Sequence, residues 1–139
     1  MTVTFFGHKD TPATIQPYLE KVLEELILNR NANEFYVGNN GLFDSMVKTT
    51  LEKLKNKYSF IRYSVVLAYL PQNKQGDYSD TIYPEGLENV PMRFAICKRN
   101  DWMISKADIV ITYVNYTFGG AYKYKEKSIK MGREIIELS

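Results

Sequence analysis

The apolar residues of this chain form short continuous runs separated by longer segments with helical spacing. Five runs rich in β-branched and aromatic residues predict strands at residues 2–6, 34–37, 63–70, 109–114 and 134–138. Between them, apolar side chains recur three or four positions apart, which predicts helices over about residues 13–29, 43–58, 92–105 and 120–131. The predicted order is therefore βαβαβαβαβ, and we expect one domain that spans residues 1–139.

The character of the strands favours one fold class. Runs 63–70 and 109–114 are nearly free of charge, as expected of parallel strands that are covered on both faces. We predict an α/β fold, a Rossmann-like three-layer α/β/α sandwich with a mostly parallel five-stranded sheet. In chain order the expected strand arrangement is 3-2-1-4-5, with the flavodoxin-like order 2-1-3-4-5 as the competing topology.

Four polar segments follow predicted strands, at residues 7–10, 38–41, 70–91 and 115–120. The loops at the carboxyl ends of parallel strands converge on one crevice, where ligands bind. The segment 71–91 is rich in Gly, Asn, Asp, Ser and Pro, so we predict a long loop there, of a length that is usually functional or mobile. The sequence thus predicts where a ligand binds before it indicates which ligand.

Composition narrows the classes of function. Hydrophobic residues make up 45% and charged residues 24%, as in globular proteins, and no apolar run or leader signal predicts a membrane segment. We therefore expect a cytoplasmic location and no membrane partner. The formal net charge of +2 is close to balance, so we expect no nucleic-acid partner, whereas a small anionic ligand remains compatible.

Cysteine and histidine are too few for a metal site. The single cysteine, Cys97, excludes an intramolecular disulfide and is expected to be a buried, inert thiol. His8 is the single histidine, so we predict no metal site and no cofactor.

The pair Gly119 and Gly120 follows a predicted strand and opens a predicted helix. Free backbone N–H groups and the helix dipole favour an anion such as phosphate at this position. The neighbouring residues Asn115, Tyr116 and Thr117 add polar and stacking groups. We predict a phosphate-binding turn here, with a simple tight turn as the alternative.

The first turn, with Gly7, His8 and Lys9, occupies the place where such folds commonly hold the phosphate or ribose of a nucleotide. His8 is predicted to be either a hydrogen-bonding ligand group or an ordinary loop residue. Lys9 can supply a point charge to a phosphate or remain a solvated surface lysine.

The second turn contains Gly38, Asn39 and Gly41, whose residue types suit backbone conformations with positive φ. Asp44 follows near the start of a predicted helix. Its carboxylate either accepts hydrogen bonds from ribose hydroxyls or interacts favourably with the helix dipole.

The third predicted helix carries Arg93, Arg99 and Asn100. Arginines beside a glycine-rich turn can bind phosphate through forked, charge-assisted hydrogen bonds. The alternative is surface ion pairing with Asp101 or Glu88.

Together these segments resemble the SLOG superfamily, the Rossmann-like group that includes the DNA-processing protein domain, LOG-type phosphoribohydrolases and small uncharacterised bacterial and phage proteins. The resemblance covers nearly the whole chain and rests on four short blocks in order, residues 6–9, 38–44, 99–103 and 119–121. The likeness is to the small bacterial and phage branch, and it implies a nucleotide-binding domain that forms a homodimer or higher homo-oligomer. Trp102, Met103 and Met46 would supply the apolar contact surface.

In LOG-type enzymes the glycine turn reads Pro-Gly-Gly-x-Gly-Thr-x-x-Glu, and the glutamate acts on the ribose. Here the two glycines and Glu126 fall in register, but Phe118, Tyr122 and Lys123 replace the proline, the third glycine and the threonine. The resemblance therefore implies altered phosphate binding and a catalytic role for Glu126. Otherwise Glu126 is a solvent-facing residue that pairs with Lys123 or Lys130.

Three functions remain open at this point. The first is a module that senses or sequesters a nucleotide or nucleotide-derived molecule, with Tyr113 or Tyr122 against the base. The second is an N-glycosidic hydrolase of a nucleoside monophosphate, in which Glu126 stabilises oxocarbenium-like charge. The third is a protein-interaction scaffold with a vestigial crevice.

Overall fold

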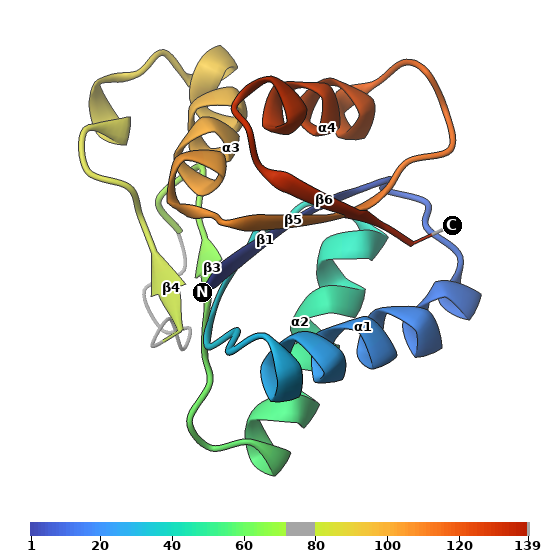
Figure 1. Cartoon of the computed structure of the whole chain (residues 1–139). Helices are drawn as coiled ribbons and strands as arrows, with labels where there is room; N and C mark the ends of the chain where they lie inside the picture. The colour runs from blue at the N-terminus through green and yellow to red at the C-terminus, as the bar shows by residue number, and fades with distance from the viewer. Residues whose placement is uncertain (72–79, 139) are drawn as a thin grey trace.

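A computed structural model describes residues 1–71 and 80–138, which form a parallel six-stranded sheet between two layers of helices (Figure 1). The sheet order is β4-β3-β2-β1-β5-β6, and every neighbouring pair is parallel. The strands are β1 (Thr2–Gly7), β2 (Glu34–Val37), β3 (Arg62–Val66), β4 (Thr81–Ile82), β5 (Ile109–Tyr113) and β6 (Glu134–Glu137).

Two helices cover each face of the sheet. α1 (Gln16–Asn29) and α2 (Leu42–Lys57) lie on one face, below the sheet in Figure 1, while α3 (Ala95–Lys106) and α4 (Gly120–Lys130) lie on the other. Short 3₁₀ turns, η1 (Ala13–Ile15) and η3 (Met92–Phe94), precede α1 and α3, and η2 (Leu87–Asn89) lies between β4 and η3.

The predicted Rossmann-like α/β/α sandwich is confirmed, and its five predicted strands stand in the order 3-2-1-4-5. The prediction of five strands is wrong, because a sixth strand, β4, pairs with β3 inside the segment predicted to be a loop. β4 has only two residues, too few to show alternation in the sequence. β3 ends at Val66, earlier than predicted, and the part of that loop at residues 72–79 lies outside the described residues.

The core consists of two apolar clusters, one on each face of the sheet. Successive side chains of a strand point to opposite faces, so Phe5 packs with the cluster under α1 and α2, and Phe6 packs with the cluster under α3 and α4. The second cluster also contains Met103 and Tyr124. This smaller cluster is the floor beneath the candidate site described below.

Burial corrects two expectations from the sequence. Met103 is only 1% exposed, so it does not contribute to the apolar contact surface predicted for it, whereas Trp102 and Met46 are partly buried and the predicted oligomer stays a prediction. Cys97 is partly rather than fully buried, and its sulfur accepts a hydrogen bond from the Tyr124 hydroxyl. Within residues 1–71 and 80–138, no helix combines the length and apolar character needed to cross a membrane.

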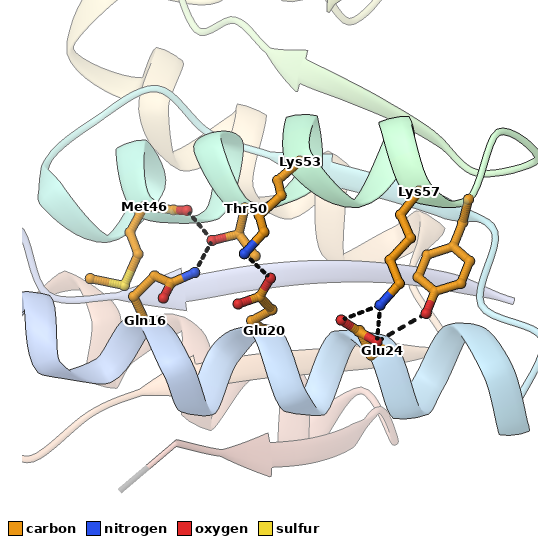
Figure 2. Close-up of polar contacts among 8 residues, drawn as sticks. Gln16, Glu20, Glu24, Met46, Thr50, Lys53 and Lys57 are labelled. Carbon is orange, nitrogen blue, oxygen red and sulfur yellow. Dashed lines mark hydrogen bonds and ion pairs between the residues drawn. The ribbon is translucent and has the colours of Figure 1, made fainter.

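A ladder of polar contacts joins α1 to α2 (Figure 2). Lys53 Nζ lies 2.7 Å from Glu20 Oε1, and Lys57 Nζ lies 3.2 Å from Glu24 Oε2. The Tyr58 hydroxyl donates to the same Glu24 oxygen at 2.9 Å. Nearer the start of both helices, the ladder continues through Gln16, Thr50 and Met46. The charged groups of this ladder are therefore satisfied by one another.

Candidate functional site

A cavity of about 400 Å³ lies at the carboxyl-terminal edge of the sheet. Four elements contribute to it: the end of β1 with its following turn, the start of α2, one side of α3, and the first turn of α4. Its lining comprises Phe5, Phe6, Gly7, His8, Lys9, Asp10, Asn40, Asp44, Ile96, Arg99, Asn100, Met103, Gly120, Ala121 and Tyr124.

The turns after β1, β2 and β5 therefore meet, as the parallel topology predicts. None of the described residues of the fourth predicted segment, 70–71 and 80–91, lines the cavity. We call this cavity the rim cleft.

Arg99 lies at the base of the rim cleft and is 2% exposed. Its Nη1 donates to the backbone oxygen of Val66 at 2.8 Å and to Asn39 Oδ1 at 3.2 Å, and its Nε donates to Asn100 Oδ1 at 2.8 Å. Among the described residues, no hydrogen bond engages the remaining nitrogen, Nη2. Burial lowers the pKa of Arg99, and the nearby Asp44 carboxylate partly offsets this effect.

Asp44 lies opposite this guanidinium in the first turn of α2. Burial raises the pKa of its carboxyl to about 6, although the backbone N–H of Asn40, which donates to Oδ2 at 2.9 Å, and the charge of Arg99 both act to lower it. Its place in the first turn of α2 is compatible with the predicted interaction with the helix dipole, and its predicted contact with ribose stays a prediction. A carboxyl that titrates near neutral pH in a cleft is also a feature of functional sites.

Gly38 lets these two side chains come together. A Cβ at this position would lie 2.8 Å from Asp44 Oδ2 and 3.2 Å from Arg99 Cζ, so any larger residue would displace one of them. Gly38 is buried and does not line the rim cleft itself. It contributes to the site indirectly, because its lack of a side chain lets Asp44 and Arg99 lie close together.

The turn after β1 is tied to both of its neighbours. The backbone oxygen of Lys9 accepts a hydrogen bond from the N–H of Leu42 at 2.8 Å, which joins it to the start of α2 beside Gly41. On the other side, His8 Nε2 accepts a hydrogen bond from the N–H of Asn115 at 3.0 Å. His8 thus makes a structural hydrogen bond to the β5–α4 turn, and its predicted role as a hydrogen-bonding group for a ligand stays a prediction.

The His8 ring begins a column of three aromatic rings. Tyr116 lies over it with a centroid distance of 4.3 Å, and Phe118 stacks on Tyr116 at 5.4 Å with an interplanar angle of 13°. Exposure increases outward, since His8 is buried, Tyr116 is 41% exposed and Phe118 is 71% exposed. The column therefore leads from the wall of the rim cleft to solvent.

The first turn of α4 opens onto the rim cleft through Gly120 and Ala121. The N-cap residue, Gly119, has φ 91° and makes no side-chain cap hydrogen bond. The first N–H groups of a helix have no intrahelical acceptor, so this turn presents donors and the positive end of the dipole. A Cβ at Gly120 would meet no atom within 4 Å, so the space beside this turn is open.

Several predicted site residues do not line the rim cleft. Arg93 lies in η3, is exposed and stacks over Phe94 at 4.8 Å, so it does not act as a pair with Arg99. Glu126 and Tyr122 lie on α4 but do not line the rim cleft, and the catalytic role of Glu126 stays a prediction. The remaining predicted residues outside the lining are Gly38, Asn39, Gly41, Asn115, Thr117 and Gly119.

The sequence analysis missed the apolar side of the rim cleft. Ile96 and Met103 line it together with Arg99 and Asn100, at the spacing of one helix face. Tyr124 lies across from them, and burial together with its hydrogen bond to Cys97 raises its pKa. The spacing of three, four and seven residues along α3 shows in the sequence that these residues share one helix face. It does not show that this face points toward the turns at the carboxyl ends of the strands.

Charges in the rim cleft are mixed. Lys9 and Arg99 are the basic residues in its lining, and Asp10 and Asp44 are the acidic ones. Across the described part of the chain, no group of three or more His, Cys, Asp or Glu residues is arranged to hold a metal ion.

The fold and the cleft define a Rossmann-like α/β/α domain with a candidate ligand site at the strand-order reversal between β1 and β5. Solved structures that share this fold include two of DNA processing protein A. DNA processing protein A from Streptococcus pneumoniae superposes with a TM-score of 0.70 at 17% identity, and the protein of the same name from Helicobacter pylori with a TM-score of 0.67 at 12% identity. The matches cover 98% and 99% of this chain, which spans 49% and 64% of those two chains. Neither the models of known protein families nor the curated proteins contain a match to the sequence.

These neighbours confirm the fold that the resemblance to the SLOG superfamily implies, while the small bacterial and phage branch stays a prediction. They also correct the expected absence of a nucleic-acid partner, because the Helicobacter pylori structure is described for its single-stranded DNA binding mode. Near-neutral net charge does not exclude such a partner. The net charge of +2 is a sum over the whole chain and does not fix the charge at any one part of its surface.

Proposed function

We propose that the rim cleft binds the phosphate group of a nucleotide, either a free nucleotide or one within single-stranded nucleic acid. The observation that carries the proposal is the convergence of the buried Arg99 guanidinium and the uncapped first turn of α4 on one cavity. Each of these two groups favours an anion.

Each group has a distinct role. The N–H groups at Gly120 and Ala121 donate to phosphate oxygens, and Arg99 adds a charge-assisted hydrogen bond through Nη2. Lys9, exposed at the mouth, attracts the anion as a point charge. Asp44 opposes the phosphate when it is ionised, so binding favours its protonated form, which the raised pKa makes accessible.

The fold neighbours support a nucleic-acid source for this phosphate. The Helicobacter pylori protein, whose fold this chain shares, has a described single-stranded DNA binding mode. A sensing or sequestering role for a free nucleotide uses the same cleft and the same contacts. The two sources differ in whether further nucleotides contribute to affinity.

Isothermal titration with inorganic phosphate, nucleoside 5′-monophosphates, single-stranded oligonucleotides and duplexes tests the proposal. The informative variant is Gly120→Asp, since a carboxylate in the first helical turn stabilises the helix by about 0.3 to 1 kcal/mol but repels a bound anion. We expect unchanged or raised thermal stability together with at least a ten-fold loss of affinity.

Thr49→Asp is the matched control, because Thr49 is exposed on α2 and the change in net charge is the same. Equal loss of affinity in both variants, or no binding of any phosphate ligand to the unchanged protein, contradicts the proposal. Single strands that bind no better than mononucleotides identify a free nucleotide as the ligand.

A second candidate is hydrolysis of an N-glycosidic bond in a nucleoside monophosphate. One observation favours it, the Asp44 carboxyl with a pKa of about 6 in the lining of the rim cleft. Such a group can exchange a proton near neutral pH. Release of free base that Asp44→Asn abolishes and Glu126→Gln leaves intact supports this function, and the absence of any release excludes it.

A further inference from the structure

We infer that Tyr116 and Phe118 form a stacking site for an unpaired base of a nucleic-acid strand, next to the nucleotide whose phosphate occupies the rim cleft. The inference rests on the proposed phosphate site and extends it to a second subsite. We call the exposed pair of rings the aromatic shelf.

The geometry of the aromatic shelf suits a planar ligand. The two rings are nearly parallel, with an interplanar angle of 13°, and the inner ring, Tyr116, contacts His8 at a centroid distance of 4.3 Å and a tilt of 38°. Phe118 ends the column and is 71% exposed, so a further ring can continue the same stack. Bases stack on aromatic side chains irrespective of sequence, because every base has a π-face.

The position of the aromatic shelf connects it to the rim cleft. Phe118 is two residues from Gly120, a separation of at most about 7 Å along the chain, and Gly120 lines the cleft. A phosphate at the first turn of α4 therefore brings the sugar and base of its strand within reach of the shelf. Because the column runs outward to solvent, the stacked base lies outside the cleft, where a strand can continue.

The aromatic shelf is also held in place before any ligand binds. The N–H of Asn115 donates to His8 Nε2 at 3.0 Å, which ties the shelf's loop to the turn after β1. Ordering a loop on binding costs affinity, so a prearranged pair of rings retains more of its stacking energy. A base-stacking role accounts for keeping two exposed rings in register at this point of the surface.

The experiment compares two ligands of equal charge, a 5′-phosphorylated single-stranded oligonucleotide and an abasic strand of the same length, by fluorescence anisotropy. The unchanged protein should bind the strand with bases about ten-fold more tightly. Phe118→Ala and Tyr116→Ala should remove most of this preference while leaving affinity for the abasic strand unchanged. Phe60→Ala is the matched control, since Phe60 is 59% exposed and precedes β3 at the opposite edge of the sheet.

The outcomes separate this inference from the function on which it rests. If the abasic strand and inorganic phosphate bind but bases add no affinity, the stacking site is wrong and the phosphate site stands. If neither phosphate ligand binds, both fail. If Phe118→Ala instead changes the sedimentation coefficient of the protein, the shelf is a contact between copies of the chain and the inference is overturned.

Discussion

The α1–α2 face and the rim cleft use charged residues in opposite ways. On the first, lysines and carboxylates pair across the two helices in partly exposed positions, where each charge has a nearby partner and solvent (Figure 2). The hydrogen bond from Lys53 lowers the pKa of Glu20, as expected of a satisfied surface pair. In the cleft, burial raises the pKa of Asp44 although Arg99 is close.

The difference shows that the cost of removing charges from water falls on the rim cleft rather than on the α1–α2 face. Exposed ion pairs contribute little to stability and have no unmet demand for a ligand. Buried charges are costly to desolvate, and they persist where they serve a site. The pKa of Asp44, raised by burial, and that of Glu20, lowered by its pairing, therefore separate the rim cleft from the α1–α2 face.

The largest predicted effect comes from removing the buried arginine. Arg99→Met should lower the free energy of unfolding by about 3 to 5 kcal/mol, because it leaves Asp44 buried without its neighbouring positive charge. Urea denaturation at pH 7.5 measures this loss. Asp44→Asn in the same chain should recover at least half of it, and a double variant no more stable than the single one would show that the two residues are not coupled.

The next effect concerns pH. The pKa of Asp44 is raised from 3.8 to about 6 in the folded protein, so between these values the folded chain retains a proton that the unfolded chain has released. Stability contributed by this group is present at low pH and is lost as pH rises through 6, by at most about 3 kcal/mol.

Asp44→Asn should therefore flatten the pH dependence of unfolding between pH 4 and 7. Urea titrations in steps of half a pH unit provide the measurement, with Glu20→Gln as the control from the opposite face. An identical slope in the unchanged protein and the Asp44 variant would place the titrating group elsewhere.

Gly38→Ala tests whether stability and phosphate affinity depend on the close approach of Asp44 and Arg99 to the backbone at position 38. The added methyl would press against Asp44 and Arg99, and overpacking of this kind costs about 1 to 3 kcal/mol. Phosphate affinity should fall as well, because the guanidinium must move. Gly120→Ala, where the new Cβ meets nothing within 4 Å, should retain its stability, which thermal unfolding of both variants would establish.

The smallest effect belongs to the ladder. Lys53→Met removes the ion pair with Glu20. Because the Lys53 side chain is 68% exposed, the free energy of unfolding should change by less than about 1 kcal/mol. Affinity for phosphate ligands should not change. A loss of stability as large as that of Arg99→Met would contradict the difference between the exposed pairs of the ladder and the buried charges of the rim cleft.

Periodicity and the parallel topology were sufficient to predict most of the fold. Predicted strand 34–37 coincides with β2, and the order around β1 is as expected, because charge-free runs and alternating helices leave few arrangements. β4 was missed because its two residues lie within a polar segment. Its pairing depends on β3, a partner that local pattern does not identify.

The site was predictable in place but not in composition. The turns after β1, β2 and β5 meet where the parallel topology requires. The prediction that Arg93 and Arg99 act as a pair did not identify which arginine faces the cleft. In the structure η3 ends at Phe94 and α3 starts at Ala95, which leaves only Arg99 inside. The aromatic shelf has no periodic signal because its rings lie in a loop. Its stacking depends on His8, more than a hundred positions earlier in the chain.

The missing side chain at Gly38 has an evolutionary consequence. Since a Cβ there would collide with both Asp44 and Arg99, the three positions cannot vary independently. In homologous sequences, a larger residue at position 38 should coincide with shorter side chains at 44 or 99. Such covariation would mark the three as a single inherited unit, although positions 38 and 99 are 61 residues apart in the sequence.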